Sequence, residues 1–229
     1  MIIEQDENLV IIGEGETAEL AWDYFSRLGF RVAGFSVERA YLKKKQMRGL
    51  PVVPFEDVED TFNPEFYWAF VAVSYTQLNH LRSRLVSAAK SKGYRLASYI
   101  SPKACIGSEV EIGENCFILE NTAIQRGAKI GANVTIWIGS SLGHRTTVED
   151  NCFFATNVAV SGFCSVGKNS FLGVSSCTSD GVKVGRNCVI GAGAVVIKDT
   201  VEGRVYAGNP ARALPKKTTE PYILGEQTI

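Results

Sequence analysis

The chain has 229 residues, of which 45% are hydrophobic and 21% are charged, the balance of an ordinary soluble protein. Its 24 basic and 24 acidic residues cancel, so no strong positive field favours a nucleic-acid or acidic-lipid partner. No apolar run is long enough for a membrane span, and the first residues lack the features of a signal peptide. We therefore expect a cytoplasmic protein without a nucleic-acid or membrane partner.

The first hundred residues alternate between strand and helix patterns. Short apolar runs at residues 8–13, 31–37 and 67–74 are typical of buried strands. Two helices are predicted by apolar residues at helical spacing: Ala18, Trp22, Phe25 and Leu28 in the first, and Leu78, Leu81, Leu85 and Ala88 in the second. The alternation predicts a small Rossmann-like α/β domain with a largely parallel sheet over residues 1–100.

A ligand of such a sheet binds at the carboxyl ends of the strands, which here carry the stretch GEGETA (13–18) and Ser74. Gly13 and Gly15 fit a phosphate-binding turn, whereas the charges of Glu14 and Glu16 would repel a pyrophosphate. A nucleotide-type ligand and a simple tight turn both remain open. Glu38, at the end of the second strand, is either a ribose partner or a solvated residue.

From Ile106 onwards the sequence repeats every six residues. The repeating positions are Ile106, Ile112, Ile118, Ile124, Ile130, Ile136, Leu142, Val148, Phe154, Val160, Val166, Leu172, Thr178, Val184, Ile190 and Val196. All but Thr178 are apolar, and a small or β-branched residue follows each one four positions later. Such a repeat is the signature of a parallel β-helix, in which three units close one coil. We predict an all-β parallel β-helix over residues 101–201 and a C-terminal loop and tail over residues 202–229.

The cysteines fit the same repeat. Four of the six, Cys116, Cys152, Cys164 and Cys188, occupy the small inward position. No cysteine pair has the spacing of a metal site, so we expect core packing rather than disulfides or zinc.

His144 is one of only two histidines, and it lies outside both inward positions of the repeat. It follows Leu142 by two residues, at a turn, so its side chain can point outward. Its neighbours one coil away are Arg126 and Gly162. An imidazole on a rigid wall beside a glycine backbone is a candidate general base. The other histidine, His80, is expected to be a solvated helix residue.

The repeat, together with the stretches GHR, VAVSG, IGAGAVVIKD and VYAGNPAR, resembles the left-handed β-helix acyltransferases. The short α/β domain in front is similar to that of the sialic-acid O-acetyltransferase-like and bacterial nucleotide-sugar N-acetyltransferases. The left hand is implied by this resemblance alone, because the general crossover rule favours the opposite hand. Gamma-class carbonic anhydrases share the repeat but need three histidines for zinc, so no metal is expected.

The resemblance implies a homotrimer, with acetyl-CoA bound between two β-helices and a nucleotide-linked amino sugar held by the N-terminal domain. The reaction would serve surface glycans such as lipopolysaccharide. His144 would be the general base, and the backbone N–H of Gly162 would face the acetyl oxygen. Lys198, Gly208 and Arg212 lie in the segment that approaches CoA in the family; a solvated terminal segment is the alternative.

Arg145 departs from the pattern of the family, in which a carboxylate or a second histidine often follows the catalytic histidine. A guanidinium cannot accept the second imidazole N–H. Either Glu149, Asp150 or a backbone carbonyl is therefore expected to orient the ring, or Arg145 has another task such as holding a sugar phosphate. N-acetylation of an amino sugar is the leading prediction. Sugar O-acetylation, an inactive scaffold and NAD binding by the first domain are the alternatives.

Overall fold

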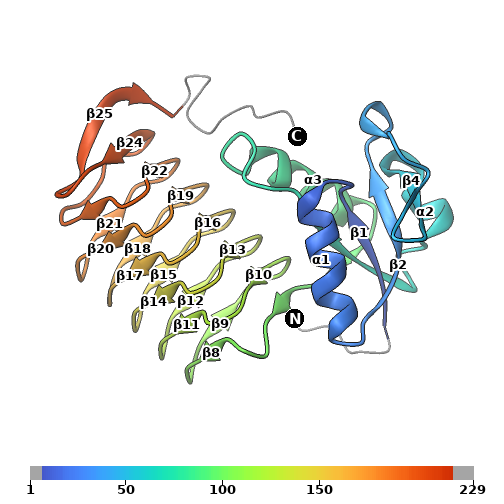
Figure 1. The fold of residues 1–229 in the computed structure, drawn as a ribbon, viewed down its shortest axis with the longest axis horizontal. Helices are drawn as coiled ribbons and strands as arrows, with labels where there is room; N and C mark the ends of the chain where they lie inside the picture. Colours follow the sequence, from blue (N-terminus) through green and yellow to red (C-terminus); the bar gives the residue numbers. More distant parts are fainter. Residues whose placement is uncertain (1–6, 219–229) are drawn as a thin grey trace. The chain divides into compact units, whose positions relative to one another are not determined.

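The computed structural model describes residues 7–218, which form two compact units (Figure 1). The first contains residues 7–74 and 81–99, and the second contains residues 75–80 and 100–218. In the described part of the chain, no helix has the length and apolar character that crossing a membrane requires.

The first unit is built on one six-stranded sheet. Its strands, in spatial order, are β3 (Gln46–Met47), β4 (Leu50–Pro54), β2 (Arg31–Val37), β1 (Asn8–Ile12), β5 (Tyr67–Val71) and β6 (Arg95–Leu96). Neighbouring strands are parallel, except that β3 is antiparallel to β4. The largely parallel α/β sheet predicted from the sequence is therefore present.

Helices cover both faces of this sheet. They are α1 (Glu16–Arg27), α2 (Val58–Thr61) and α3 (His80–Ser91), with 3-10 turns at Arg39–Tyr41 and Phe55–Asp57. Phe25 of α1 packs edge-on against Phe70 of β5, with ring centroids 5.1 Å apart. The next residue, Val71, joins the cluster on the opposite face with Val58 of α2 and Leu85 of α3. Successive strand residues point to opposite faces, so α1 lies on one side and the other two helices on the other.

The second helix begins later than the sequence pattern predicts. Leu78 was expected on its apolar face, but Gln77, Leu78 and Asn79 all have positive φ, near 52°, 52° and 63°. Residues 75–80 instead pack on the β-helix unit, where Leu78 joins Val189 and Val205 in a small apolar cluster. The apolar contact of Leu78 is therefore with the β-helix rather than with its own helix.

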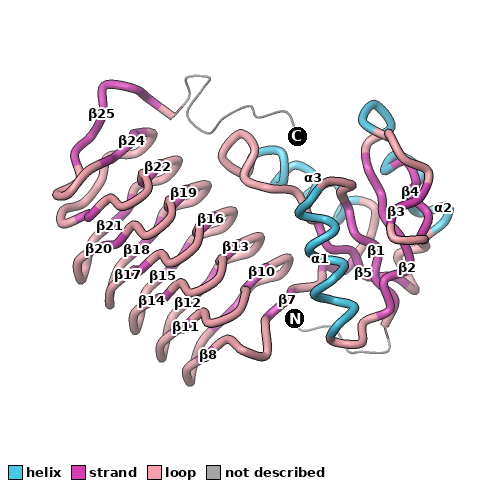
Figure 2. The backbone as a smooth tube through the Cα atoms, viewed as in Figure 1, coloured by secondary structure: helices cyan, strands magenta, loops and turns pink. Residues whose placement is uncertain are grey.

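The second unit is a parallel β-helix made of three sheets (Figure 2). One sheet contains β7 (Tyr99–Ile100), β10 (Phe117–Ile118), β13 (Thr135–Ile136), β16 (Phe153–Phe154), β19 (Phe171–Leu172), β22 (Val189–Ile190), β24 (Arg204–Ala207) and β25 (Arg212–Lys217). The second contains β8 (Cys105–Ile106), β11 (Ala123–Ile124), β14 (Ser141–Leu142), β17 (Ala159–Val160), β20 (Cys177–Thr178) and β23 (Val195–Val196). The third contains β9 (Glu111–Ile112), β12 (Lys129–Ile130), β15 (Thr147–Val148), β18 (Ser165–Val166) and β21 (Lys183–Val184).

Every strand from β8 to β23 ends on the position that the six-residue repeat predicts, which is apolar in all of them except β20, where it is Thr178. Leu142, for example, pairs with Val160, the residue eighteen positions later and one coil further along. The corners are equally regular, because a left-handed φ recurs every six residues at Glu109, Asn115, Asn121, Gly127, Asn133, Gly139, Arg145, Asn151, Asn157, Phe163, Asn169, Ser175, Gly181, Asn187 and Gly193. Asparagine and glycine dominate because they tolerate this conformation best.

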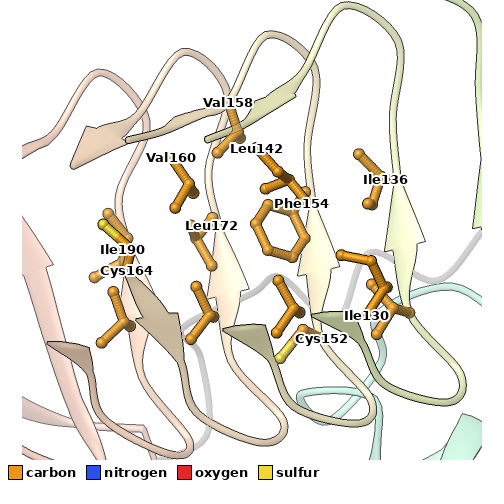
Figure 3. Close-up of a cluster of buried hydrophobic side chains, with 14 of the residues drawn as sticks. Ile130, Ile136, Leu142, Cys152, Phe154, Val158, Val160, Cys164, Leu172 and Ile190 are labelled. Carbon is orange, nitrogen blue, oxygen red and sulfur yellow. The ribbon is translucent and has the colours of Figure 1, made fainter. Parts of the chain in front are cut away.

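The core of the β-helix is a single column of inward side chains (Figure 3). Leu142, Phe154 and Leu172 are almost fully buried, as are the cysteines of the small inward position. All six cysteines are free thiols. Burial raises the pKa of the Cys152 thiol to about 12, as expected for a packing residue.

Candidate active site

His144 lies at the corner after β14, where the chain turns towards the next sheet. Because β14 pairs in register with β11 and β17, the residues beside His144 on the neighbouring coils are Arg126 and Gly162. The sequence spacing predicted both neighbours. His144 is exposed, as expected for a side chain outside the inward positions.

The imidazole of His144 rests directly against the backbone of Gly162. A Cβ added to Gly162 would lie 2.6 Å from Cε1, 2.9 Å from Nδ1 and 3.0 Å from Nε2 of that ring. A Cβ on Gly143 would in turn lie 2.4 Å from the backbone nitrogen of Gly162. The two glycines therefore bring the coils close enough for the imidazole to lie flat on the wall.

Gln125 orients the imidazole. Its side-chain oxygen accepts the backbone N–H of His144 at 2.9 Å and lies 3.2 Å from Nδ1. An amide oxygen can only accept, so this contact places the ring proton on Nδ1 and leaves the lone pair of Nε2 available. No sequence motif indicates Gln125, because a residue nineteen positions before His144 becomes its neighbour only through the geometry of the coil.

The two carboxylates proposed from the sequence to orient the ring have other partners. Glu149 accepts the backbone N–H of Lys168 at 3.0 Å and contacts Arg186 Nε at 3.2 Å. Asp150 accepts the backbone N–H of Ala132 at 2.9 Å. Both residues lie at the next corner of the coil, so that expectation was wrong.

Phe163 packs against the His144 ring, and Arg145 lies over Phe163. The Phe163 ring, 57% exposed, meets His144 edge-on with centroids 4.7 Å apart. The Arg145 guanidinium carbon lies 5.8 Å from the Phe163 centroid, so its charge rests on this aromatic face. Both residues have φ near 55°, at corner positions where asparagine or glycine usually stands. Backbone strain of this kind concentrates at functional sites.

The backbone N–H of Gly162, predicted to face the acetyl oxygen, donates to Asp180 Oδ1 at 2.9 Å. Asp150 and Ala132 make the same bond across one coil at another corner. Gly162 can therefore bind an acetyl oxygen only if Asp180 gives up this hydrogen bond.

These groups surround a cavity of about 310 Å³. Its walls are formed by Ala123, Gln125, Ser141, Leu142, Gly143, His144, Ala159, Val160, Ser161, Gly162 and Asp180. The volume is at the small end of the range for ligand pockets, and the wall consists mainly of small side chains. The cavity therefore combines a base, a carboxylate and space for a small reacting group.

The predicted nucleotide residues gather at the carboxyl edge of the first unit's sheet. Gly13 follows β1, and a Cβ there would lie 2.6 Å from the carbonyl oxygen of Ala72, so only glycine fits. Gly15 caps α1 and leaves open space beside it. Ser74 lies beyond the end of β5, and Glu16 begins α1. The sheet order β2-β1-β5 brings these segments together, as predicted.

Two acidic residues at this edge of the sheet, Glu14 and Glu38, already have hydrogen-bond partners within the protein. The Glu14 carboxylate accepts the backbone N–H of Lys43 at 3.3 Å. Glu38 forms a two-pronged ion pair with Arg84, with both N–O distances 2.8 Å. Hydrogen bonding to Arg84 lowers the pKa of Glu38 below its usual value. Glu38 must therefore share its oxygens with Arg84 if it binds a ribose hydroxyl.

The predicted CoA residues lie beyond the cavity wall. Lys198 is the register neighbour of Asp180 on the next coil and is exposed. Gly208 has a φ of 94° and precedes the cis peptide bond between Asn209 and Pro210. Arg212 is exposed and starts β25. The tail beyond residue 218 lies outside the described residues. Among residues 7–218, no group of acidic, histidine or cysteine side chains is arranged to hold a metal ion.

Comparisons with known proteins identify the class of fold. A family model described as the hexapeptide repeat of succinyl-transferase matches residues 164–198. The acetyltransferase domain of PglB from Neisseria gonorrhoeae is 24% identical with a TM-score of 0.82, and the match covers 91% of this chain and 100% of that one. WeeI from Acinetobacter baumannii is 22% identical with a TM-score of 0.81, over 91% and 100% of the two chains. None of the curated proteins matches the sequence.

A third solved structure is the most informative. It is a histidine-to-asparagine mutant of perosamine N-acetyltransferase from Caulobacter crescentus in complex with CoA and GDP-perosamine. It is 27% identical with a TM-score of 0.83, and the match covers 92% of this chain and 98% of that one. The predicted resemblance to the left-handed β-helix acetyltransferases is therefore confirmed.

Proposed function

We propose that this chain is an acetyl-CoA-dependent N-acetyltransferase that acts on a nucleotide-linked amino sugar. The observation that carries the proposal is the imidazole of His144, which Gln125 orients so that Nε2 is free on the wall of a 310 Å³ cavity. The fold agrees, because a similar solved acetyltransferase holds CoA and GDP-perosamine. Two such neighbours carry a substituted histidine, which fits a histidine-dependent reaction.

The reaction assigns a task to each group. The nitrogen lone pair of the acceptor amine attacks the thioester carbonyl carbon, and His144 Nε2 takes the proton that the amine loses. The carbon–sulfur bond then breaks, and the CoA thiolate leaves and takes up a proton. An imidazole with a free Nε2 lone pair is suited to accept this proton and to release it in each cycle.

The remaining predicted residues fit the binding of the two substrates. The Rossmann-like first unit binds the nucleotide at Gly13, Gly15 and Ser74. In the β-helix unit, Arg145 supplies a positive charge for a substrate phosphate. Lys198, Gly208 and Arg212 bind the CoA nucleotide, where basic side chains pair with phosphates. The enzyme works in the cytoplasm as a homotrimer whose active sites lie between subunits, and its product enters surface-glycan biosynthesis.

The test is acetyl transfer to a panel of UDP-, dTDP- and GDP-linked amino sugars, followed by mass spectrometry. We expect a product heavier by one acetyl group and stable to mild base. His144→Ala should slow its formation strongly, whereas His80→Ala, which changes the other histidine, should not. A base-labile product would assign O-acetylation instead. If no acceptor reacts and CoA does not bind, the chain is an inactive scaffold.

A further inference from the structure

Asp180 is a charged residue of the cavity wall to which neither the sequence analysis nor the acetyl-transfer mechanism gives a role. It lies one coil beyond Gly162 and two coils beyond His144, in one straight column set by the register of the sheet. Neighbouring coils are about 4.8 Å apart. The Asp180 side chain reaches back along this column, because Oδ1 accepts the Gly162 N–H at 2.9 Å.

The carboxylate of Asp180 and the imidazole of His144 therefore both lie against Gly162 and line the same cavity. The imidazole covers the Cα of Gly162, where a Cβ would lie within 3.0 Å of Nε2, and the carboxylate is bonded to the nitrogen of the same residue. A small cationic group in the cavity above Gly162 can approach both side chains together. This places a negative charge beside the proposed proton acceptor.

The charge of Asp180 has no basic partner among residues 7–218. Lys198 is its register neighbour on the next coil, but no ion pair joins the two side chains in that part of the chain. A carboxylate accepts about four hydrogen bonds, so the bond from Gly162 leaves most of this capacity free. An anchored carboxylate with a free oxygen is suited to bind a cation.

Asp150 makes the same kind of hydrogen bond between coils as Asp180 and serves as a comparison. It accepts the Ala132 N–H at 2.9 Å across one coil, as Asp180 does with Gly162. Asp150 lies outside the cavity, however, and Lys168 Nζ approaches its second oxygen at 3.6 Å. The hydrogen bond between neighbouring coils and the contact with Lys168 therefore account for both carboxylate oxygens of Asp150. The hydrogen bond between coils does not account for the second oxygen of Asp180, which has no basic partner among residues 7–218.

We infer that Asp180 binds the ammonium form of the acceptor amine and so makes the site prefer an amine over a hydroxyl acceptor. This inference rests on the proposed acetyl transfer to an amino sugar. A primary amine with a pKa near 8 is mostly protonated at neutral pH, whereas a sugar hydroxyl is neutral. The ammonium forms an ion pair as well as a hydrogen bond with Asp180, whereas a neutral hydroxyl forms the hydrogen bond alone. His144 then takes one ammonium proton, and the freed lone pair attacks the thioester carbon. As the carbon–sulfur bond breaks, the second proton that the nitrogen loses passes to the departing CoA thiolate.

The test compares Asp180→Asn with the matched control Asp150→Asn. Asparagine keeps an oxygen that can accept the Gly162 N–H but removes the charge. Binding and kcat/KM are measured for a nucleotide-linked amino sugar and for its analogue with a hydroxyl in place of the amine. For Asp180→Asn we expect about a 10- to 100-fold loss with the amine and little change with the hydroxyl analogue. The Asp150→Asn enzyme should discriminate like the wild type.

The outcomes separate this inference from the proposed function. If Asp180→Asn keeps the wild-type preference for the amine, Asp180 only closes the gap between coils and the inference is overturned. If the wild-type protein acetylates neither acceptor, the proposed function fails, and the binding data still decide the role of Asp180. Asp180→Ala gives a second test, because it removes both the charge and the anchor and should lose the same preference.

Discussion

The imidazole of His144 occupies the space that a side chain at Gly162 would fill. The nearest approach of an added Cβ is 2.6 Å, to Cε1 of the ring, whereas real carbon atoms do not come this close. The position of the imidazole therefore depends on Gly162, one coil away, having no side chain. The β-helix supplies this relationship because its coils repeat every eighteen residues in strict register.

Gly162→Ala should displace the imidazole and lower the rate of acetyl transfer by about 10²- to 10⁴-fold, the range for loss of a general base. Gly162 does not have a left-handed φ, so alanine fits its backbone and the fold should persist. Steady-state kinetics and thermal unfolding of the variant check both statements.

A double-mutant cycle provides the control for this prediction. If alanine at position 162 acts by displacing the imidazole, it should cost little further activity in a protein that already carries His144→Ala. Full additivity of the two losses would contradict the proposed link.

Gln125→Leu removes the acceptor that holds Nδ1 and should lower kcat by about 10- to 100-fold, as loss of an orienting partner typically does.

Gln125→Glu places a carboxylate at the same point, where it stabilises the imidazolium. The acid limb of the kcat/KM profile should then move to higher pH. The kcat/KM profile is measured across about pH 5–9, which includes the range in which histidine titrates. If the profile of Gln125→Glu is unchanged, Gln125 does not contact the ring in solution.

The cysteines offer a test of the core that is independent of activity. Burial raises the pKa of Cys152 to about 12, and Cys116, Cys164 and Cys188 are buried with it. These four thiols should resist iodoacetamide in the native protein and react after denaturation, because the thiolate is the reactive form. Peptide mass mapping reads out each site. Rapid labelling of Cys152 in the folded protein would contradict the described packing.

Leu142→Ala should lower the free energy of unfolding by about 2–5 kcal/mol, because it leaves a cavity in the column of inward side chains. Thr147→Ala changes an exposed residue of a neighbouring strand and should alter that free energy by about 0.5 kcal/mol or less. Denaturant titration of the two variants tests the comparison. Equal effects would mean that the repeat is out of register.

The β-helix could be predicted from the sequence because its fold is local and periodic. The repeating positions from Ile106 to Val196 recur at a constant spacing of six residues, so one register predicts all the strands from β8 to β23. The same spacing placed Gly162 beside His144. Leu78 was misplaced because its apolar contact is with Val189 and Val205, more than a hundred residues away. Helical spacing carries no information about such a contact.

The partners of His144 were harder to predict, because they depend on side-chain reach. Gln125 lies one coil before His144 and contacts its ring, whereas Asp180 lies two coils beyond His144 and contacts Gly162. The sequence instead suggested Glu149 and Asp150, which are close along the chain but lie at another corner of the coil. In a solenoid, residues eighteen or nineteen positions apart are better candidates for contact than residues five or six apart.

The central claim is that His144 is the general base of acetyl transfer to a sugar amine, and its pH profile tests this most directly. In the wild-type protein, kcat/KM should rise with pH through a limb that depends on His144. In His144→Ala this limb should disappear and the rate should fall by about 10²- to 10⁴-fold, with only the titration of the amine remaining. A variant that keeps the wild-type rate and the same limb would contradict the claim.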